Sequence, residues 1–105
     1  MKLQWEDRTW EEYEYWLTQD KRTLKRINAL IRDIMRSPFD GIGKPEPLKG
    51  NLSGLWSRRI DETNRIVYFA KDYIVFIISC KVHYDNSLIF KLCTIQYVWK
   101  THTFV

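Results

Sequence analysis

The segment Lys44-Pro-Glu-Pro-Leu-Lys-Gly-Asn-Leu-Ser-Gly-Leu-Trp-Ser-Arg-Arg59 separates a helix-rich first half of the chain from a strand-rich second half. Each proline in it pushes the preceding residue into an extended conformation, so Glu46, between Pro45 and Pro47, projects from a stiff backbone. A rigid carboxylate among cations suits acid–base chemistry on a phosphodiester. A solvated loop made of ordinary turn residues is the alternative that this motif leaves open.

Two antiparallel helices are predicted before this segment. The first begins with a capping box of Thr9 and Glu12. Its aromatic and apolar core positions recur at helical spacing and are Trp10, Tyr13, Trp16 and Leu17. The second covers residues 21–36, is capped by Asp20 and ends at Ser37-Pro38, because proline cannot continue a helix. Its apolar stripe has a period of 3.6 and consists of Leu24, Ile27, Leu30, Ile31, Ile34 and Met35.

The strands are predicted from short apolar runs. One lies at Lys2–Trp5, and three follow the central segment at Leu55–Ile60, Arg65–Ala70 and Tyr73–Cys80. Their short connections favour hairpins and an antiparallel meander. The last run is apolar without alternation, which predicts a strand covered on both faces. The expected fold is α+β in two layers, with the two N-terminal helices packed on a small, mainly antiparallel sheet.

Charge is distributed unevenly along the 105 residues, whose net charge is +4. Residues 1–20 carry six acids and two bases, whereas residues 21–36 carry six bases and one acid. The basic residues outside the apolar stripe of the second helix include Lys21, Lys25, Arg32 and Arg36. A basic segment of this density favours an anionic partner such as nucleic acid, and an ordinary solvated helix face remains open.

Several function classes are excluded by what the sequence lacks. No run approaches the roughly 18 apolar residues that a membrane span needs, and no apolar run follows Lys2 as in a signal peptide. Cys80 and Cys93 form no Cys-x-x-Cys pair, which favours buried thiols over a disulfide or metal site. No His/Cys/Asp/Glu cluster has metal-ligand spacing. The sequence therefore predicts a cytoplasmic, single-domain protein without a metal or cofactor.

The residues that could act on RNA lie at strand ends. RNA carries its own nucleophile, the ribose 2′-OH, so cleavage needs a base, a charge clamp on the phosphate and an acid for the leaving oxygen. Glu46, Arg65 and His83 are the candidates for these three tasks. The predicted phosphate-binding cations beside them are Lys44, Lys49, Arg58 and Arg59. A structural histidine, and an Arg65 paired with Asp61 or Glu62 across its hairpin, are the alternatives.

Several motifs follow one another along residues 1–84. They include Lys2-Leu-x-Trp5, Gly43-Lys-Pro-Glu-Pro-Leu-Lys49, Asn51-Leu-Ser-Gly-x-Trp56-Ser-Arg-Arg-Ile60, Arg65-x-Val-Tyr68 and His83-Tyr84. Their order closely resembles that of the YoeB toxins, ribosome-dependent mRNA interferases of the RelE/ParE superfamily that are encoded beside a YefM-type antitoxin.

The resemblance implies a RelE-like, microbial-ribonuclease-like fold that cleaves mRNA in the A site of the 70S ribosome without a metal, by attack of the 2′-OH. It implies Glu46 as general base, His83 as general acid, Arg65 as phosphate stabiliser and Tyr84 as a residue that holds the substrate near His83. The basic second helix then faces ribosomal RNA and, in part, the antitoxin. A homodimer is compatible with the resemblance.

The chain extends beyond the matching region. Family members normally end at or just beyond the His-Tyr pair, so residues 1–84 are expected to form the toxin domain and residues 85–105 an atypical C-terminal extension. The apolar run at Ser87–Val98 is expected to pack on the sheet edge or against a second copy. Two alternatives to the enzyme remain: a non-enzymatic toxin like the ParE branch, and an RNA- or antitoxin-binding module inactivated by the tail.

Overall fold

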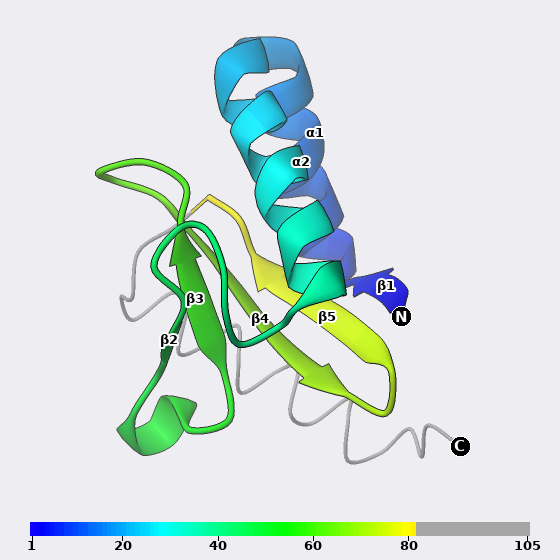
Figure 1. Ribbon diagram of the computed structural model, residues 1–105. Coiled ribbons are helices and arrows are strands. Elements are labelled where there is room, and N and C mark those ends of the chain that lie inside the picture. The colour runs from blue at the N-terminus through cyan, green and yellow to red at the C-terminus, as the bar shows by residue number, and fades with distance from the viewer. Residues whose placement is uncertain (82–105) are drawn as a thin grey trace.

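A computed structural model describes residues 1–81 (Figure 1). In this part of the chain two helices precede most of the strands. The helices are α1 (Asp7–Gln19) and α2 (Lys21–Arg36), with a short 3-10 helix, η1, at Gly50–Leu52. The strands are β1 (Lys2–Trp5), β2 (Glu46–Pro47), β3 (Trp56–Arg59), β4 (Arg65–Lys71) and β5 (Ile74–Ser79).

The described strands form one sheet in the order β1-β5-β4-β3-β2. Strands β3, β4 and β5 are a meander of antiparallel neighbours, as the short connections predicted. Strand β1 pairs in parallel with β5, a partner that the sequence did not specify, and β2 pairs antiparallel with β3. The α+β class and the mainly antiparallel sheet are confirmed.

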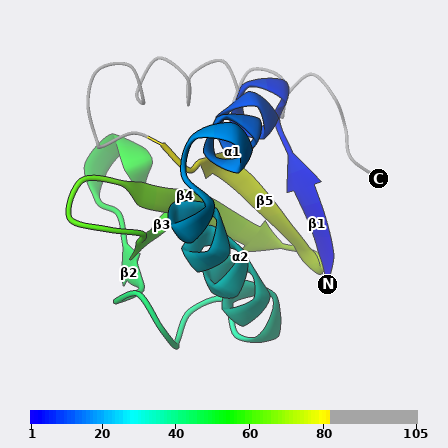
Figure 2. The ribbon, with the colours of Figure 1, turned by 90° about the horizontal axis from the view of Figure 1, so that it is seen from above.

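Both helices lie over the same face of the sheet (Figure 2). The apolar stripe of α2 is confirmed as the centre of this layer, since Ile27, Leu30 and Ile34 are fully buried against Ile66 and Ile77 of the sheet. Burial of these branched side chains is the main favourable contribution to packing helix on sheet.

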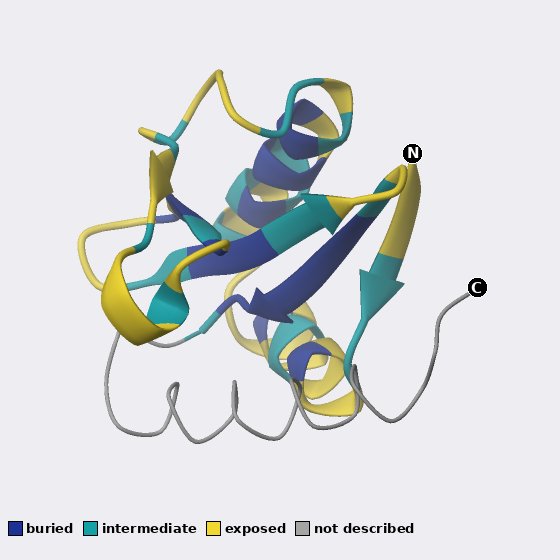
Figure 3. Ribbon diagram, turned by 90° about the horizontal axis from the view of Figure 1, so that it is seen from below, coloured by how far each residue is buried: buried dark blue, intermediate teal, exposed yellow. Residues whose placement is uncertain are grey.

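A second apolar cluster lies on the opposite face of the sheet and contains Leu55, Val67, Phe76 and Ile78. Strand β5 contributes to both clusters, which confirms that it is covered on both faces. Figure 3 shows the resulting concentration of buried residues in the central strands.

The ends of α2 are as predicted. The Asp20 carboxylate accepts hydrogen bonds from the amides of Arg22 and Thr23, both at 3.1 Å, which satisfies two donors that a helix start leaves open. The helix ends at Arg36, with Ser37 as its C-cap directly before Pro38.

The predicted capping box of α1 is wrong. The helix begins at Asp7, so Thr9 and Glu12 lie inside it. Thr9 Oγ1 donates to the carbonyl of Ile78 at 2.7 Å, and the Glu12 carboxylate accepts from the Cys80 amide at 2.9 Å. Trp16 Nε1 donates to the Cys80 carbonyl at 2.9 Å. Side chains three and four positions apart share a helix face, so α1 holds the backbone at the end of β5 instead of capping itself.

The predicted aromatic core of α1 is only partly correct. Trp16 is buried and Tyr13 packs against the core, whereas Trp10 is 46% and Leu17 51% exposed. Cys80 is buried, as expected. Neither helix in residues 1–81 is long and apolar enough to cross a membrane. Cys93, the boundary at residue 84 and the extension 85–105 lie outside the described residues.

Candidate functional site

Glu46 and Arg65 form the centre of the candidate site. Arg65 Nη1 lies 2.8 Å from Glu46 Oε1, although the two residues are 19 positions apart. The Glu46 side chain is 53% exposed and that of Arg65 is 22% exposed. The pair therefore combines an accessible carboxylate with a guanidinium that the protein surface partly encloses.

The sheet register places Arg59 beside this pair. Arg59 lies directly opposite Arg65 in the β3–β4 ladder, and Glu46 lies opposite Ser57. Directly opposed residues project from the same face of a sheet, and residues two apart on a strand share a face. Glu46, Arg59 and Arg65 consequently lie on one face, the face turned away from the helices.

Two like charges opposed across a ladder destabilise it, and a carboxylate paired with one of them, as Glu46 is with Arg65, offsets part of this cost. Arg59 and Arg65 thus produce a local positive potential that Glu46 partly neutralises. A phosphate group could take over that neutralising role, because guanidinium binds carboxylate and phosphate with the same geometry. The arrangement offers a base and two charge-stabilising groups at one place.

The backbone around Glu46 differs from the expected loop. Glu46 and Pro47 form the edge strand β2, and proline is tolerated there because an edge strand needs fewer donors. The Pro-Glu-Pro unit, predicted to be stiff, is thereby also held to the sheet, because Glu46 pairs with Ser57. Asp61, the alternative partner of Arg65, instead accepts from the amides of Thr63 and Asn64 at the hairpin turn.

Arg58 is fully buried, on the helix side of β3. Its guanidinium forms an ion pair with Asp33 of α2, and Nε donates to Tyr68 Oη at 3.1 Å. It also donates to three loop carbonyls, those of Ser37, Asp40 and Ile42, at 2.6, 3.0 and 3.2 Å. The phosphate-binding role predicted for Arg58 does not fit this position, because all of its donor groups are enclosed. Burial of one arginine could have been expected from the alternation of side chains along β3. Two consecutive residues point to opposite faces, so one of the two arginines must face the core.

Asp33 is the acidic partner in this network, and it is the single acid of α2. Hydrogen bonds from Arg36, from the Ile42 amide at 2.9 Å and from Arg58 lower the pKa of Asp33 from 3.8 to about 2. Tyr68 Oη in turn donates to the carbonyl of Pro38, and burial raises the pKa of Tyr68. The network ties α2, β3 and β4 to the loop that leads to Glu46.

The loop between α2 and β2 passes so close to this network that two positions require glycine. A Cβ on Gly41 would lie 1.9 Å from Asp33 Oδ2, and one on Gly43 would lie 2.6 Å from Leu30 Cδ2. Their φ angles, +130° and +80°, also disfavour other residues. The Gly43 carbonyl accepts from the Arg59 amide at 2.7 Å, which connects the loop directly to the candidate site.

The remaining predicted cations are exposed. Lys44 lies just before β2 in the chain and Lys49 just after it, directly before η1. The four α2 cations predicted to form a basic surface are also exposed, namely Lys21, Lys25, Arg32 and Arg36. His83 and Tyr84 lie outside the described residues, two and three positions after the last of them.

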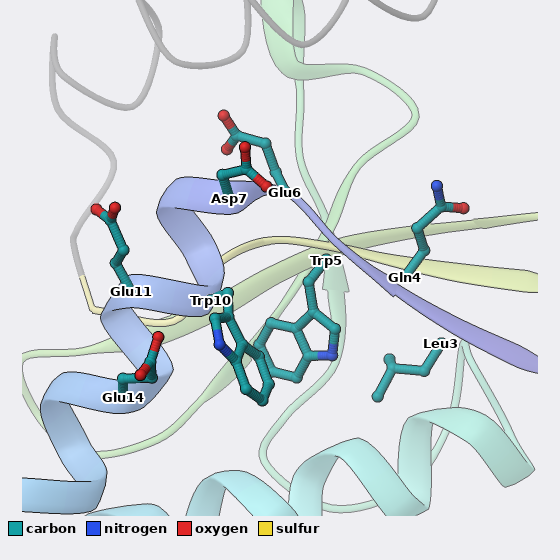
Figure 4. Close-up of a pocket in the computed structure, with 8 residues that line it drawn as sticks. All are labelled: Leu3, Gln4, Trp5, Glu6, Asp7, Trp10, Glu11 and Glu14. Atoms are coloured by element: carbon teal, nitrogen blue, oxygen red, sulfur yellow. The ribbon is translucent and has the colours of Figure 1, made fainter.

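A groove of about 570 Å³ lies at the opposite edge of the sheet, between β1 and α1 (Figure 4). Trp5 and Trp10 lie in it with their rings 5.5 Å apart, edge to face. Its other lining residues are Leu3, Gln4, Glu6, Asp7, Glu11 and Glu14. Four carboxylates would repel a phosphate backbone, so this groove is distinct from the Glu46–Arg65 site and unsuited to RNA.

Comparisons with known proteins point to one family. A family model for the "YoeB-like toxin of bacterial type II toxin-antitoxin system" matches residues 5–84. "Toxin YoeB" of Escherichia coli K12 is 55% identical over 84 residues, which are 80% of this chain and the whole of that protein.

Solved structures agree with the sequence comparison. A YoeB/ParE toxin from Agrobacterium tumefaciens has a TM-score of 0.77 at 46% identity, over 80% of this chain and 100% of its own. The YoeB dimer from Staphylococcus aureus has a TM-score of 0.75 at 42% identity, and the toxin in the YoeB-YefM complex of that species one of 0.74 at 41% identity; each match covers 80% of this chain and 98% of the other. A mutant of the Escherichia coli toxin RelE in its free state shares the fold with a TM-score of 0.68 at 15% identity, over 90% of this chain and 95% of its own.

Proposed function

Because this chain belongs to the YoeB-like toxins of bacterial type II toxin–antitoxin systems, we propose that it is an endoribonuclease that cleaves mRNA on the ribosome. The observation that carries the proposal is the exposed Glu46–Arg65 pair, with Arg59 opposite Arg65 on the same sheet face. Together these groups supply a base and a positive clamp, which are two of the three functions that RNA cleavage requires.

The proposed reaction needs no bound metal, because the nucleophile belongs to the RNA. Glu46 takes the proton of the 2′-OH as the 2′ oxygen forms a bond to phosphorus. Arg65 and Arg59, with Lys49, stabilise the added charge on the phosphate oxygens. His83 then protonates the 5′ oxygen as the P–O5′ bond breaks, with Tyr84 holding the substrate beside it. The products are a cyclic phosphate end, which opens to a 3′-phosphate, and a 5′-hydroxyl end.

The proposed partners follow the family. We propose that the chain binds a YefM-type antitoxin and forms a homodimer, as its relative from Staphylococcus aureus does in solved structures. The exposed cations of α2 face ribosomal RNA in this proposal, and the site of action is the cytoplasm. Binding that displaces counterions from RNA weakens steeply as salt concentration rises.

The proposal is tested by incubating the protein with a defined mRNA, with and without 70S ribosomes, and mapping the RNA ends. Cleavage only with ribosomes, with cyclic or 3′-phosphate ends, is the expected result. A 2′-deoxy substitution at the cut nucleotide should abolish the cut, since it removes the nucleophile.

Glu46→Gln supplies the second arm of this test, with Glu11→Gln at the remote groove as a matched control. Glu46→Gln should lower cleavage by roughly 10²–10⁴-fold, the usual contribution of a general base, while Glu11→Gln should cut normally. Intact mRNA under all conditions would favour a non-enzymatic binder on the same scaffold.

A further inference from the structure

We propose that the buried Arg58–Asp33–Tyr68 network is the positioning element of the candidate site, because it sets the path of the loop that carries Glu46. This inference rests on the proposed function and assigns to these three residues a role in rate. None of the three is proposed to touch the substrate.

The loop from Ser37 to Gly43 has no regular secondary structure and therefore no ladder of its own. Backbone groups that leave regular structure need partners elsewhere. Here Arg58 donates hydrogen bonds to the carbonyls of Ser37, Asp40 and Ile42, and Tyr68 donates one to that of Pro38. The loop is consequently fastened along most of its length to one buried network.

The loop reaches Glu46 over a very short path. The Ile42 amide donates a hydrogen bond to Asp33, and the Arg59 amide donates one to the Gly43 carbonyl. Glu46 follows, paired with Ser57 in the sheet. Only Lys44 and Pro45 separate Gly43 from Glu46, and the φ angle of Pro45 is restricted by its ring. Because the connection has so little conformational freedom, a shift of the backbone at Ile42 or Gly43 also moves the Glu46 carboxylate.

The network also includes residues of the two strands that carry Arg59 and Arg65. Tyr68 lies on β4 three residues after Arg65, and Arg58 adjoins Arg59 on β3. The same buried network therefore holds the loop that leads to Glu46 against β3 and β4, the strands of Arg59 and Arg65. An error of about 1 Å in such a geometry can lower a rate by roughly 10²-fold.

The test uses Tyr68→Phe, which removes the hydroxyl between Arg58 and Pro38 while retaining the ring in the core. Arg58→Lys is the stronger variant, because an ammonium lacks the planar fork that reaches several acceptors. Ile27→Val is the matched control, a buried change in the same core cluster as Tyr68 that removes no hydrogen bond of the network, because the Ile27 side chain is a hydrocarbon. Cleavage on mRNA-programmed ribosomes is measured as a maximal rate and as the half-saturating ribosome concentration, beside amide hydrogen exchange.

The expected result is a maximal rate lowered roughly ten-fold by Tyr68→Phe and up to about 10²-fold by Arg58→Lys, with the half-saturating concentration unchanged. Exchange at the Ile42 and Arg59 amides should become faster in both variants. Ile27→Val should keep the wild-type rate at a similar loss of stability. If Arg58→Lys does not fold, Tyr68→Phe decides the question.

Two results overturn the proposal. One is a normal rate in Tyr68→Phe although exchange at Ile42 is faster. The other is an equal fall in rate in Ile27→Val, which would mean that any loss of core stability has this effect. A wild-type protein that cuts no mRNA on ribosomes rejects the proposed function itself, and this is distinguished by the wild-type arm alone.

Discussion

Arg58 and Arg59 are neighbours of the same type on one strand, yet the fold gives them opposite environments. Arg58 faces the helix layer, is fully buried and donates to Asp33, Tyr68 and the loop carbonyls. Arg59 faces away from the helices, is exposed and lies opposite Arg65. The difference shows that the direction of the side chain, which alternates along a strand, decides whether an arginine stabilises the fold or is available to a substrate.

The largest expected effect comes from Arg58→Ala. Removing one partner of a buried ion pair leaves an uncompensated charge, which typically costs about 3–5 kcal/mol, a large share of a small domain's stability. We expect the urea midpoint of unfolding to fall sharply or the protein to be unfolded. A variant with wild-type stability would show that the buried network does not support the fold.

Arg59→Ala should give the reverse pattern. Loss of one preorganised charge at the transition state typically lowers a rate by roughly 10²-fold, whereas an exposed substitution changes stability by only about 0.5 kcal/mol. Cleavage rates on ribosomes and urea melts of the same sample check both parts. Wild-type cleavage would exclude Arg59 from the phosphate clamp and would leave the two arginines without a functional contrast.

Gly43→Ala should have an intermediate effect on stability. The new Cβ would approach Leu30 Cδ2 to 2.6 Å at a φ of +80°, and strain of this kind costs about 1–3 kcal/mol. Thermal unfolding should show the loss, with Gly50→Ala as the control, because its φ is also positive but its Cβ would meet nothing within 4 Å. Equal losses in the two variants would mean that backbone strain alone, and not the close approach to Leu30, is responsible.

The last expected effect is the dependence of the Arg58–Asp33 ion pair on pH. The pKa of Asp33 is about 2 in the folded protein, below the ordinary 3.8, so its stabilising contribution is complete above pH 3.8 and is lost as the pH falls toward 2. Asp33→Asn should therefore be less stable than wild type at neutral pH, and the difference should shrink below pH 3.8. The pKa values of Asp20 and Asp61 are also lowered, so urea midpoints of both proteins must be compared over the same pH series. A difference that stays constant down to about pH 2 would contradict a role for the Asp33 charge.

Local patterns in the sequence were sufficient for the elements. The limits of α2 follow from Asp20 and Pro38, and its buried face from a stripe of period 3.6, because capping and amphipathicity act within a few residues. The meander follows from short connections between apolar runs. The capping box of α1 failed because Thr9 and Glu12 bind the end of β5, and such distant partners do not appear in a local pattern.

Glu46, Arg59 and Arg65 were predictable as candidate residues, but their geometry was not. The Pro-Glu-Pro unit identified Glu46 as an unusual carboxylate, and the ends of the predicted strands, together with the family motifs, identified Arg65 and Arg59. Sequence could not choose between Asp61, Glu62 and Glu46 as the partner of Arg65, because register and the path of the loop depend on contacts across the sheet. It also grouped Arg58 with the exposed cations, since two adjacent arginines are alike until one face of the strand is covered.

The sequence by itself therefore determined the two helices, the strands β1, β3, β4 and β5, the family, and Glu46, Arg59 and Arg65 as candidates for chemistry. The tertiary structure alone decided that β1 joins β5 in parallel, that Glu46 meets Arg65 at 2.8 Å, and that Arg58 is enclosed while Arg59 is exposed. The physical reason is that secondary structure depends on near neighbours, whereas burial and charge pairing depend on which surfaces the whole chain brings together.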